Sequence, residues 1–138
     1  MAATGVAVSD EVISQFNEVK LGRIKAKFII YKIDGPNIVA EKLVESGSFD
    51  DFVALLPSDD CRYAIFDMDF TTNDGRPGNK LVSISWAPDT AKVKAKMVYA
   101  GSKDALTRAL VGVATKVHAT DLSELTETIV VDACRKFA

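Results

Sequence analysis

The order of apolar and polar positions predicts helices and strands that alternate along the chain. Apolar side chains recur at helical spacing in residues 9–22, behind a serine that suits a helix N-cap. Residues 25–33 are rich in β-branched and aromatic side chains, which is typical of a strand, and a turn at residues 34–37 leads into a second strand ending at Val44. A short capped helix follows in residues 48–57 and is expected to stop at its proline.

The second half of the chain continues this alternation. We expect strands at residues 61–70 and 80–86, separated by a loop at residues 71–79 that is too long for a tight hairpin turn. A helix is predicted to begin at Pro88-Asp89 and to break at residues 101–104, where a further helix would start and run to Leu110.

The C-terminal part adds one strand and one helix. The strand is predicted at residues 113–119, and Asp121 is expected to cap the final helix, whose apolar stripe would consist of Leu125, Ile129, Ala133 and Phe137. Because helices and strands interleave without a linker or repeat, residues 1–138 are predicted to form one α/β domain around a mixed sheet.

The helix that begins near residue 88 has two apolar patches instead of one. Ala91, Ala95, Val98 and Tyr99 fall on one side, whereas Val93, Met97 and Ala100 fall on another, edged by Lys94 and Lys96. A surface helix needs a single buried stripe, so the second patch is a candidate contact surface for an acidic, partly apolar partner. The alternative is a helix buried on both sides whose lysines extend to solvent, and spacing alone leaves both interpretations open.

Composition and charge narrow the class of protein. The 138 residues are 48% hydrophobic and 26% charged, which is typical of a globular domain. The net charge of -2 gives no overall basic field for nucleic acid. No apolar run is long enough to span a bilayer, and the N-terminus lacks the features of a secretory signal.

Few residues suggest a catalytic or metal-binding role. Cys61 and Cys134 match no metal motif and are interpreted as reduced thiols, with a single disulfide as the alternative. His118 is the only histidine and has no partner at a readable spacing, so a structural role is favoured over catalysis. Asp67 and Asp69 share one strand face without further ligands, and no phosphate-binding glycine loop is present. We therefore expect neither a cofactor nor enzymatic activity, although a small α/β enzyme with an unrecognised site remains a rival hypothesis.

Several linked motifs resemble one known family. They are Asp60-Cys61-Arg62-Tyr63-Ala64-Ile65-Phe66-Asp67, Trp86-Ala87-Pro88-Asp89-Thr90-Ala91, Lys94-Ala95-Lys96-Met97-Val98-Tyr99-Ala100 and Ser102-Lys103-Asp104-Ala105-Leu106. Together with Gly5-Val6-Ala7-Val8-Ser9-Asp10 and Ala119-Thr120-Asp121, they are similar in register to the actin-depolymerising factor/cofilin family from about residue 4 to the last helix.

The resemblance implies a fold, a partner and a location. The fold would be the ADF-homology fold, with a central mixed β-sheet of five to six strands flanked by helices on both faces. The partner would be actin, both monomeric and filamentous, and binding would promote depolymerisation and severing with a preference for ADP-actin. A monomeric cytoplasmic protein of the cytoskeleton is expected, with nuclear entry left open. The alternative function is that of a coactosin-like filament-side binder or monomer sequesterer with little severing activity.

The resemblance also implies which residues touch actin. In the family, the long helix and the N-terminal segment bind the actin subunit, and the matching positions here are Thr4, Gly5, Val6, Val93, Lys94, Lys96, Met97, Ser102 and Lys103. Many members carry a phosphorylated serine where this chain has Thr4, so phosphorylation of Thr4 is one hypothesis and an unmodified contact residue is the other.

Filament binding in the family uses a second surface, formed by a projecting hairpin and the last helix. The matching residues are Arg76, Lys80, Asp132, Arg135 and Lys136, which would otherwise be ordinary solvated charges. Gly78 and Ala133 replace basic residues that are usual in the family, so this surface is predicted to be weaker here. A further expectation is binding of anionic phosphoinositides by Lys94, Lys96, Lys103 and Arg108.

Overall fold

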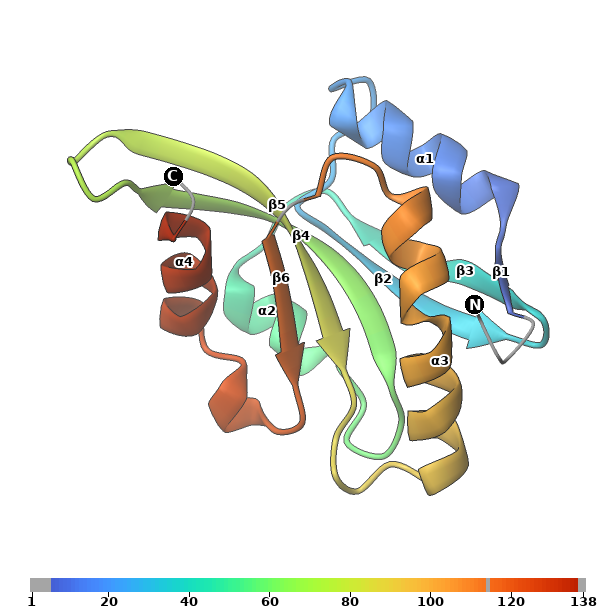
Figure 1. The fold of residues 1–138 in the computed structure, drawn as a ribbon. Helices are drawn as coiled ribbons and strands as arrows, with labels where there is room; N and C mark the ends of the chain where they lie inside the picture. Colours follow the sequence, from blue (N-terminus) through green and yellow to red (C-terminus); the bar gives the residue numbers. More distant parts are fainter. Residues whose placement is uncertain (1–5, 114, 137–138) are drawn as a thin grey trace.

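The chain folds into a curled mixed sheet with helices on both faces, as the sequence predicts (Figure 1). The computed structural model describes residues 6–113 and 115–136. In chain order the elements are β1 (Ala7–Val8), α1 (Asp10–Lys20), β2 (Phe28–Asp34), β3 (Asn37–Val44), α2 (Phe49–Ala54), β4 (Arg62–Thr71), β5 (Pro77–Trp86), α3 (Val93–Ala109), β6 (Thr115–Ala119), the 3₁₀ turn η1 (Leu122–Glu124) and α4 (Glu127–Arg135).

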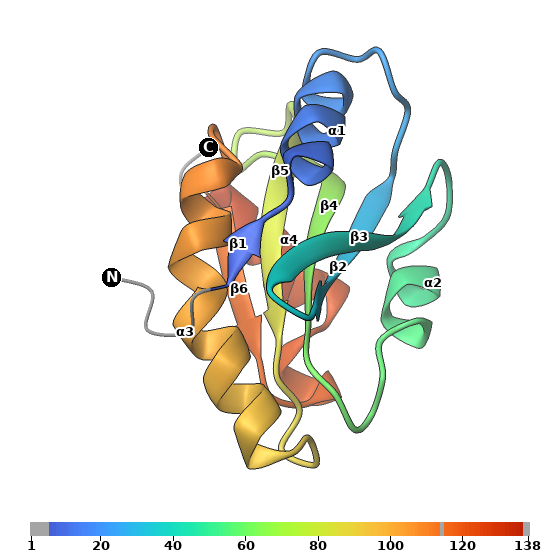
Figure 2. The same cartoon turned by 90° about the vertical axis from the view of Figure 1, so that its right-hand side faces the viewer.

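The sheet has the strand order β1-β3-β2-β4-β5-β6. Its four central strands pair antiparallel, whereas β1 pairs parallel with β3 and β6 pairs parallel with β5, so that both edges are parallel. The long β4–β5 hairpin projects beyond the rest of the sheet, and α3 lies along the opposite side (Figures 1 and 2).

Two hydrophobic layers cover the two faces of the sheet. On one face, α2 and α4 pack through Phe52, Val130 and Cys134 against the inward side chains of β4 and β5. On the other face, α1 and α3 pack through Phe16, Tyr99 and their neighbours. Because strand side chains alternate between faces, a sheet covered on both faces needs apolar residues at successive positions, as in β2 and β4.

Several local predictions are confirmed by hydrogen bonds. Ser9 caps α1 by accepting from the backbone N–H of Val12, and Ser48 forms a capping box with Asp51. The turn at residues 34–37 joins β2 and β3 as an antiparallel pair. The short helix α2 ends at Ala54, before the proline that was expected to stop it.

The expected break in the long helix was wrong. α3 is one continuous helix that begins at Val93, with Lys92 as its N-cap, and passes through Gly101 and Ser102 without interruption. Glycine inside a helix costs about 1 kcal/mol relative to alanine, but the buried side chains around it hold this segment against the sheet. Residues 88–91 form a turn instead, tied to the end of β6 by the bond from Asp89 N–H to Thr120 O.

The loop expected at residues 71–79 is a much tighter turn. β4 and β5 stay paired to Thr71 and Pro77, and Thr72 and Arg76 close the turn through a backbone hydrogen bond of 2.8 Å. Gly75 adopts φ +85, a left-handed conformation that favours glycine. Polar composition signalled a loop, but the cross-strand register determines where it begins.

The C-terminal prediction also needs correction. Asp121 caps the short turn η1 instead of the last helix, and Thr126 caps α4 by accepting from the N–H of Ile129. Val130 and Cys134 form the buried stripe of α4, whereas Ile129 is 40% exposed. Phe137 lies outside the described residues. Among the residues that the structure describes, no helix is long and apolar enough to cross a membrane.

Candidate functional site

The N-terminal end of α3 carries the most exposed large apolar side chains of the described residues. Val93 is 70% exposed and Met97 is 68% exposed, and they lie one helical turn apart. Lys94 is exposed beside them, and Lys96 is partly covered. We call these four residues the α3 patch. Exposed apolar residues edged by cations are typical of a contact surface.

The opposite side of α3 fixes the direction in which this patch faces. Tyr99 is buried, and its hydroxyl accepts a hydrogen bond of 2.9 Å from the backbone N–H of Ile33 in β2. The hydroxyl of Tyr63 in β4 donates to the backbone carbonyl of Tyr99. Burial raises the pKa of the Tyr99 phenol, and its hydrogen bond to Ile33 opposes that rise only in part. The aromatic anchors therefore set the rotation of the helix, and the division into inner and outer patches predicted from spacing is confirmed for Val93, Met97 and Tyr99.

The other predicted residues of this surface lie in different environments. Ser102 is fully buried, and its hydroxyl donates to the carbonyl of Val98 at 2.7 Å, so its side chain is not part of the exposed surface of α3. Val6 is also buried and packs into the layer beneath α1 and α3. Lys103 is partly covered. Thr4 and Gly5 lie outside the described residues.

The second predicted surface lies at the β4–β5 hairpin and α4. Arg76 is exposed near the hairpin tip and pairs with Asp74 at 3.3 Å. Lys80 instead donates a hydrogen bond of 3.0 Å to the carbonyl of Cys134, in the last turn of α4. Arg135 donates a hydrogen bond of 2.7 Å to the carbonyl of Thr71 in β4. We call these two bonds the hairpin–helix contact.

The remaining charges of α4 stay on its surface. Asp132 is exposed and pairs with Arg135 at 3.6 Å, while Lys136 is exposed beyond the end of the helix. A cation near a helix C-terminus is stabilised by the free carbonyls and the helix dipole, as Lys80 is here. The family resemblance placed all five residues in one region, but the partners of Lys80 and Arg135 are distant in the sequence, and no local pattern signals these two bonds.

Gly78 has a steric neighbour that explains its small size. It lies directly opposite Phe70 in the β4–β5 pair. A Cβ atom added at Gly78 would lie 2.8 Å from the Phe70 ring, closer than carbon atoms approach one another. The aromatic ring therefore occupies the space that any side chain at position 78 would need.

The carboxylates and thiols that the sequence offered as candidates for catalysis or metal binding have structural surroundings. Asn79 donates to Asp67 and to Asp69, and Lys27 lies 3.5 Å from Asp69. The bond from Asn79, aided by Lys27, holds the pKa of Asp69 below its usual range. Within the described ranges, no group of three His, Cys, Asp or Glu residues is arranged to hold a metal ion. Cys61 and Cys134 are free thiols buried in different layers.

Sequence patterns missed one feature near the start of α3. A cavity opens between α2, the end of β5 and η1, beside the exposed side chain of Leu122. The only local sign of this cavity in the sequence is Asp121 followed by Leu122. The sequence pattern favours Asp121 as the cap of the last helix instead.

An exposed apolar and basic helix end, together with a projecting hairpin held by a second helix, defines a protein that binds a macromolecular partner. The family described as Cofilin/tropomyosin-type actin-binding protein matches residues 5–135. The cofilin of Mycosarcoma maydis is 47% identical over 94% of both chains, and actin-depolymerizing factor 7 of Arabidopsis thaliana is 45% identical over 94% of both. The crystal structure of Streptomyces griseoflavus cofilin superposes with a TM-score of 0.87 at 41% identity, covering 96% of this chain and 98% of that one. The chain therefore belongs to the actin-depolymerising factor/cofilin family of actin-binding proteins, which confirms the predicted family and fold.

Proposed function

We propose that this protein binds actin monomers and the sides of actin filaments and promotes filament depolymerisation and severing. The names of its relatives, cofilin and actin-depolymerizing factor, support the activity. The α3 patch supports the mode of binding, since Val93 and Met97 offer a desolvatable centre with cations at its edge. Such proteins act in the cytoplasmic actin cytoskeleton, and we propose the same location here.

The work on filaments would draw on binding energy alone. A protein that binds one filament twist more tightly than another shifts the filament towards that twist. Severing and depolymerisation then follow from contacts that the shifted filament has lost. In this proposal a preference for ADP-actin arises in the same way, because the nucleotide belongs to actin and changes the conformations that the filament samples.

The decisive observation is the exposure of Val93 and Met97. The double variant Val93→Ser/Met97→Ser should lose binding to monomers and filaments, because both apolar anchors become polar while no buried contact changes. Loss of two such anchors corresponds to at least ~2 kcal/mol, or about thirtyfold in affinity. Fluorescence titration with monomers and co-sedimentation with filaments measure the two affinities.

A matched control exists just after the C-terminal ends of α1 and α3. Leu21 and Val111 are 65% and 64% exposed, so Leu21→Ser/Val111→Ser removes as much exposed apolar surface away from the α3 patch. This control should bind actin normally. Normal binding by the Val93/Met97 variant, or equal loss in the control, would show that the α3 patch is not the actin-binding surface.

The alternative is a coactosin-like protein that binds filament sides or sequesters monomers with little severing. Microscopy of single filaments distinguishes the two, because a severing protein increases the number of filament ends whereas a side binder leaves it constant. Our proposal requires new ends to appear with the wild-type protein and to disappear with Val93→Ser/Met97→Ser.

The cations of α3 support a further proposal, binding to phosphoinositide headgroups. Lys94 and Arg108 are exposed, while Lys96 and Lys103 are partly covered, and each cation near an anionic surface contributes about 1 kcal/mol. Because Lys94 and Lys96 belong to the α3 patch, vesicles containing phosphoinositides should compete with actin. Co-flotation that persists unchanged in a Lys94→Ala/Lys103→Ala variant would exclude this role.

Regulation at Thr4 is proposed from the sequence alone. A phosphate adds a charge of about -1.5 to -2, which would repel an acidic surface of actin. The variant Thr4→Glu should therefore weaken monomer binding relative to Thr4→Ala, and equal affinities of the two would argue against this form of regulation.

A further inference from the structure

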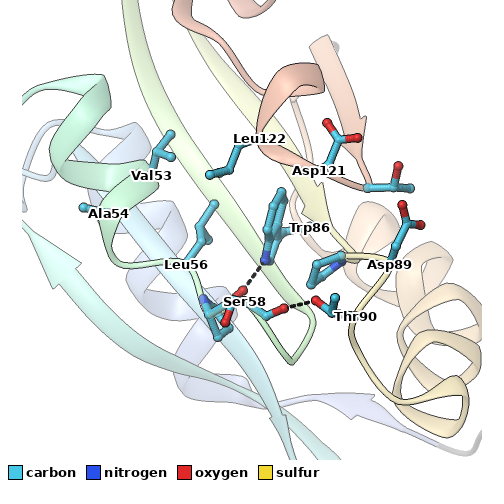
Figure 3. A pocket seen from close by; sticks show the side chains of 12 residues that line it. Val53, Ala54, Leu56, Ser58, Trp86, Asp89, Thr90, Asp121 and Leu122 are labelled. Carbon is cyan, nitrogen blue, oxygen red and sulfur yellow. Dashed lines mark hydrogen bonds between the residues drawn. The ribbon is translucent and has the colours of Figure 1, made fainter.

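The cavity near the start of α3 has an apolar wall built from three elements. Its volume is about 610 Å³, within the usual range of about 300 to 1,000 Å³ for binding sites. Val53 and Leu56 come from α2 and the residues after it, Trp86 from the end of β5, and Leu122 from η1, and these side chains point toward one another (Figure 3). Leu122 is 58% exposed, so the wall continues onto the surface of the molecule.

The opposite side of the cavity is acidic. Asp89 and Asp121 lie there, and the residues that line the cavity include no lysine or arginine (Figure 3). Asp121 accepts hydrogen bonds from the N–H groups of Ser123 and Glu124 at 2.8 and 3.2 Å, and the bonds from Ser123 hold its pKa below the usual range. The carboxylate is therefore ionised at neutral pH, and a cationic occupant would find a fixed negative charge.

Hydrogen bonds fix the shape of the cavity before anything binds. The indole N–H of Trp86 donates to the carbonyl of Pro57 at 2.7 Å, and the hydroxyl of Thr90 donates to the carbonyl of Ser58. The first bond joins the segment after α2 to the end of β5, and the second joins it to the turn that precedes α3. A site whose walls are already positioned loses less conformational entropy when a ligand binds.

We propose that this cavity is a docking site for a short segment of a partner protein that carries a bulky apolar side chain next to a lysine or arginine. The apolar side chain would pack against Trp86, Leu56 and Leu122, and the cation would pair with Asp89 and Asp121. An exposed leucine at the rim favours a peptide over a small molecule, because it extends the apolar surface beyond the cavity itself. Charge complementarity favours a basic segment over an acidic one.

The chain offers a selective probe of this site, because Trp86 is its only tryptophan. We would titrate the wild-type protein with a capped six-residue peptide of alternating leucine and arginine and follow tryptophan fluorescence. Two analogues separate the two parts of the interaction: one has citrulline in place of arginine, which removes the charge, and the other has serine in place of leucine. The proposal requires saturable binding of the parent peptide and at least about tenfold weaker binding of each analogue.

Variants of the protein test the same two contributions, the apolar contact and the charge pairing. Leu122→Asp should weaken the parent peptide by at least about tenfold, whereas Leu21→Asp, at another exposed leucine, should leave it unchanged. Asp89→Asn should reduce the difference between the arginine and citrulline peptides, since the carboxylate that senses the charge is gone. A nitrogen-15 spectrum of the Trp86 indole N–H confirms that the variants keep the bond to Pro57.

Three results would overturn the proposal. One is an unchanged Trp86 signal with every peptide. Another is dimerisation that depends on Leu122, measured by sedimentation without peptide, which would make a second copy of this chain the occupant. The last is a Leu122-dependent change in the Trp86 signal with actin but none with peptide, which would assign the cavity to actin. Because the peptide titration uses no actin, its failure is distinct from failure of the proposed actin binding.

Discussion

At the scale of single residues, Gly78 shows how a cross-strand neighbour can limit which residue a position accepts. Its Cα lies opposite Phe70, whose ring covers the space that a basic residue at position 78 would need. An aromatic side chain over a strand glycine protects the exposed backbone, which offsets part of the cost of glycine in a strand. Gly78 and Phe70 therefore have to be considered as a pair.

This pairing predicts that a basic residue introduced at position 78 alone will lower stability. Gly78→Lys should lower the free energy of unfolding by about 1–3 kcal/mol, because the new Cβ would overlap the Phe70 ring. In Phe70→Leu/Gly78→Lys the overlap is removed, so the double variant should be more stable than the sum of the single effects predicts. Urea denaturation of the four proteins measures the coupling, and a fully stable Gly78→Lys would contradict the explanation.

His118 should make stability depend on pH. Partial desolvation, aided by the charge of Lys103, lowers the pKa of His118 below 6.5 although the residue lies at the surface, and Glu124 opposes this shift only in part. Between the two pKa values the unfolded chain binds more protons than the folded chain, so the free energy of unfolding rises with pH in this window. The stabilisation is complete above the unfolded pKa of 6.5 and is lost as the pH falls towards the lower folded value.

The variant His118→Gln tests this dependence. Its urea midpoint should change less than that of the wild type when the pH is lowered from about 7.5 to about 5.5, since one source of proton uptake on unfolding has been removed. Equal changes in the two proteins would show that other groups account for the pH dependence.

At the scale of secondary-structure elements, the sequence predicted where helices begin better than whether a helix continues without a break. Ser9 and Ser48 were identified as caps because the acceptor and the N–H it satisfies lie within three residues. The passage of α3 through Gly101 was missed because tertiary packing decides it, through Tyr99 and Leu106 against the sheet.

The candidate surfaces show the same difference between features set by nearby residues and features set by tertiary contacts. Helical spacing placed Val93 and Met97 together on a second side of the helix but left open whether that side is exposed, and the family resemblance favoured exposure. The bonds of Lys80 and Arg135 could not be predicted, because each joins residues more than fifty positions apart in the chain. The family resemblance located these residues but gave no information on their partners.

The hairpin–helix contact gives Lys80 a positioning role between two elements. Lys80→Ala removes one hydrogen bond to α4, which should lower the free energy of unfolding by about 0.5–1.5 kcal/mol. Hydrogen exchange in residues 71–77 should become faster, because the hairpin projects beyond the sheet and depends on α4 for support. Filament binding should weaken while monomer binding stays normal, as measured by co-sedimentation and by monomer titration.

Two controls separate positioning from simple loss of charge. Lys42→Ala removes an exposed lysine of β3 and should change neither hydrogen exchange in the hairpin nor filament binding. Lys80→Arg keeps a donor and should restore slow exchange in the hairpin. If Lys80→Ala weakened filament binding with no change in hairpin exchange, Lys80 would be a direct contact instead.

At the scale of the whole molecule, the two proposed actin-binding surfaces lie at opposite ends. The hairpin tip and the start of α3 are separated by the length of the sheet in Figure 1, and no described side chain is common to both. The sheet and the helices packed on it thus hold the two proposed surfaces at a fixed separation, which would allow a filament, with its repeated subunits, to contact both at the same time. A monomer offers only one of these contacts in our proposal.

This arrangement predicts that the two surfaces contribute independently to filament binding. Met97→Ser and Lys80→Ala should each weaken filament binding, and the double variant should show the sum of the two losses in binding free energy to within about 0.5 kcal/mol, because distant sites that share no partners are additive. For monomers, the double variant should bind like Met97→Ser alone. Co-sedimentation at several protein concentrations supplies the filament affinities, and fluorescence titration supplies those for monomers. A filament loss in the double variant well below the sum would mean that both residues act on a single contact, and a further loss in monomer binding would mean that the hairpin also reaches the isolated actin subunit.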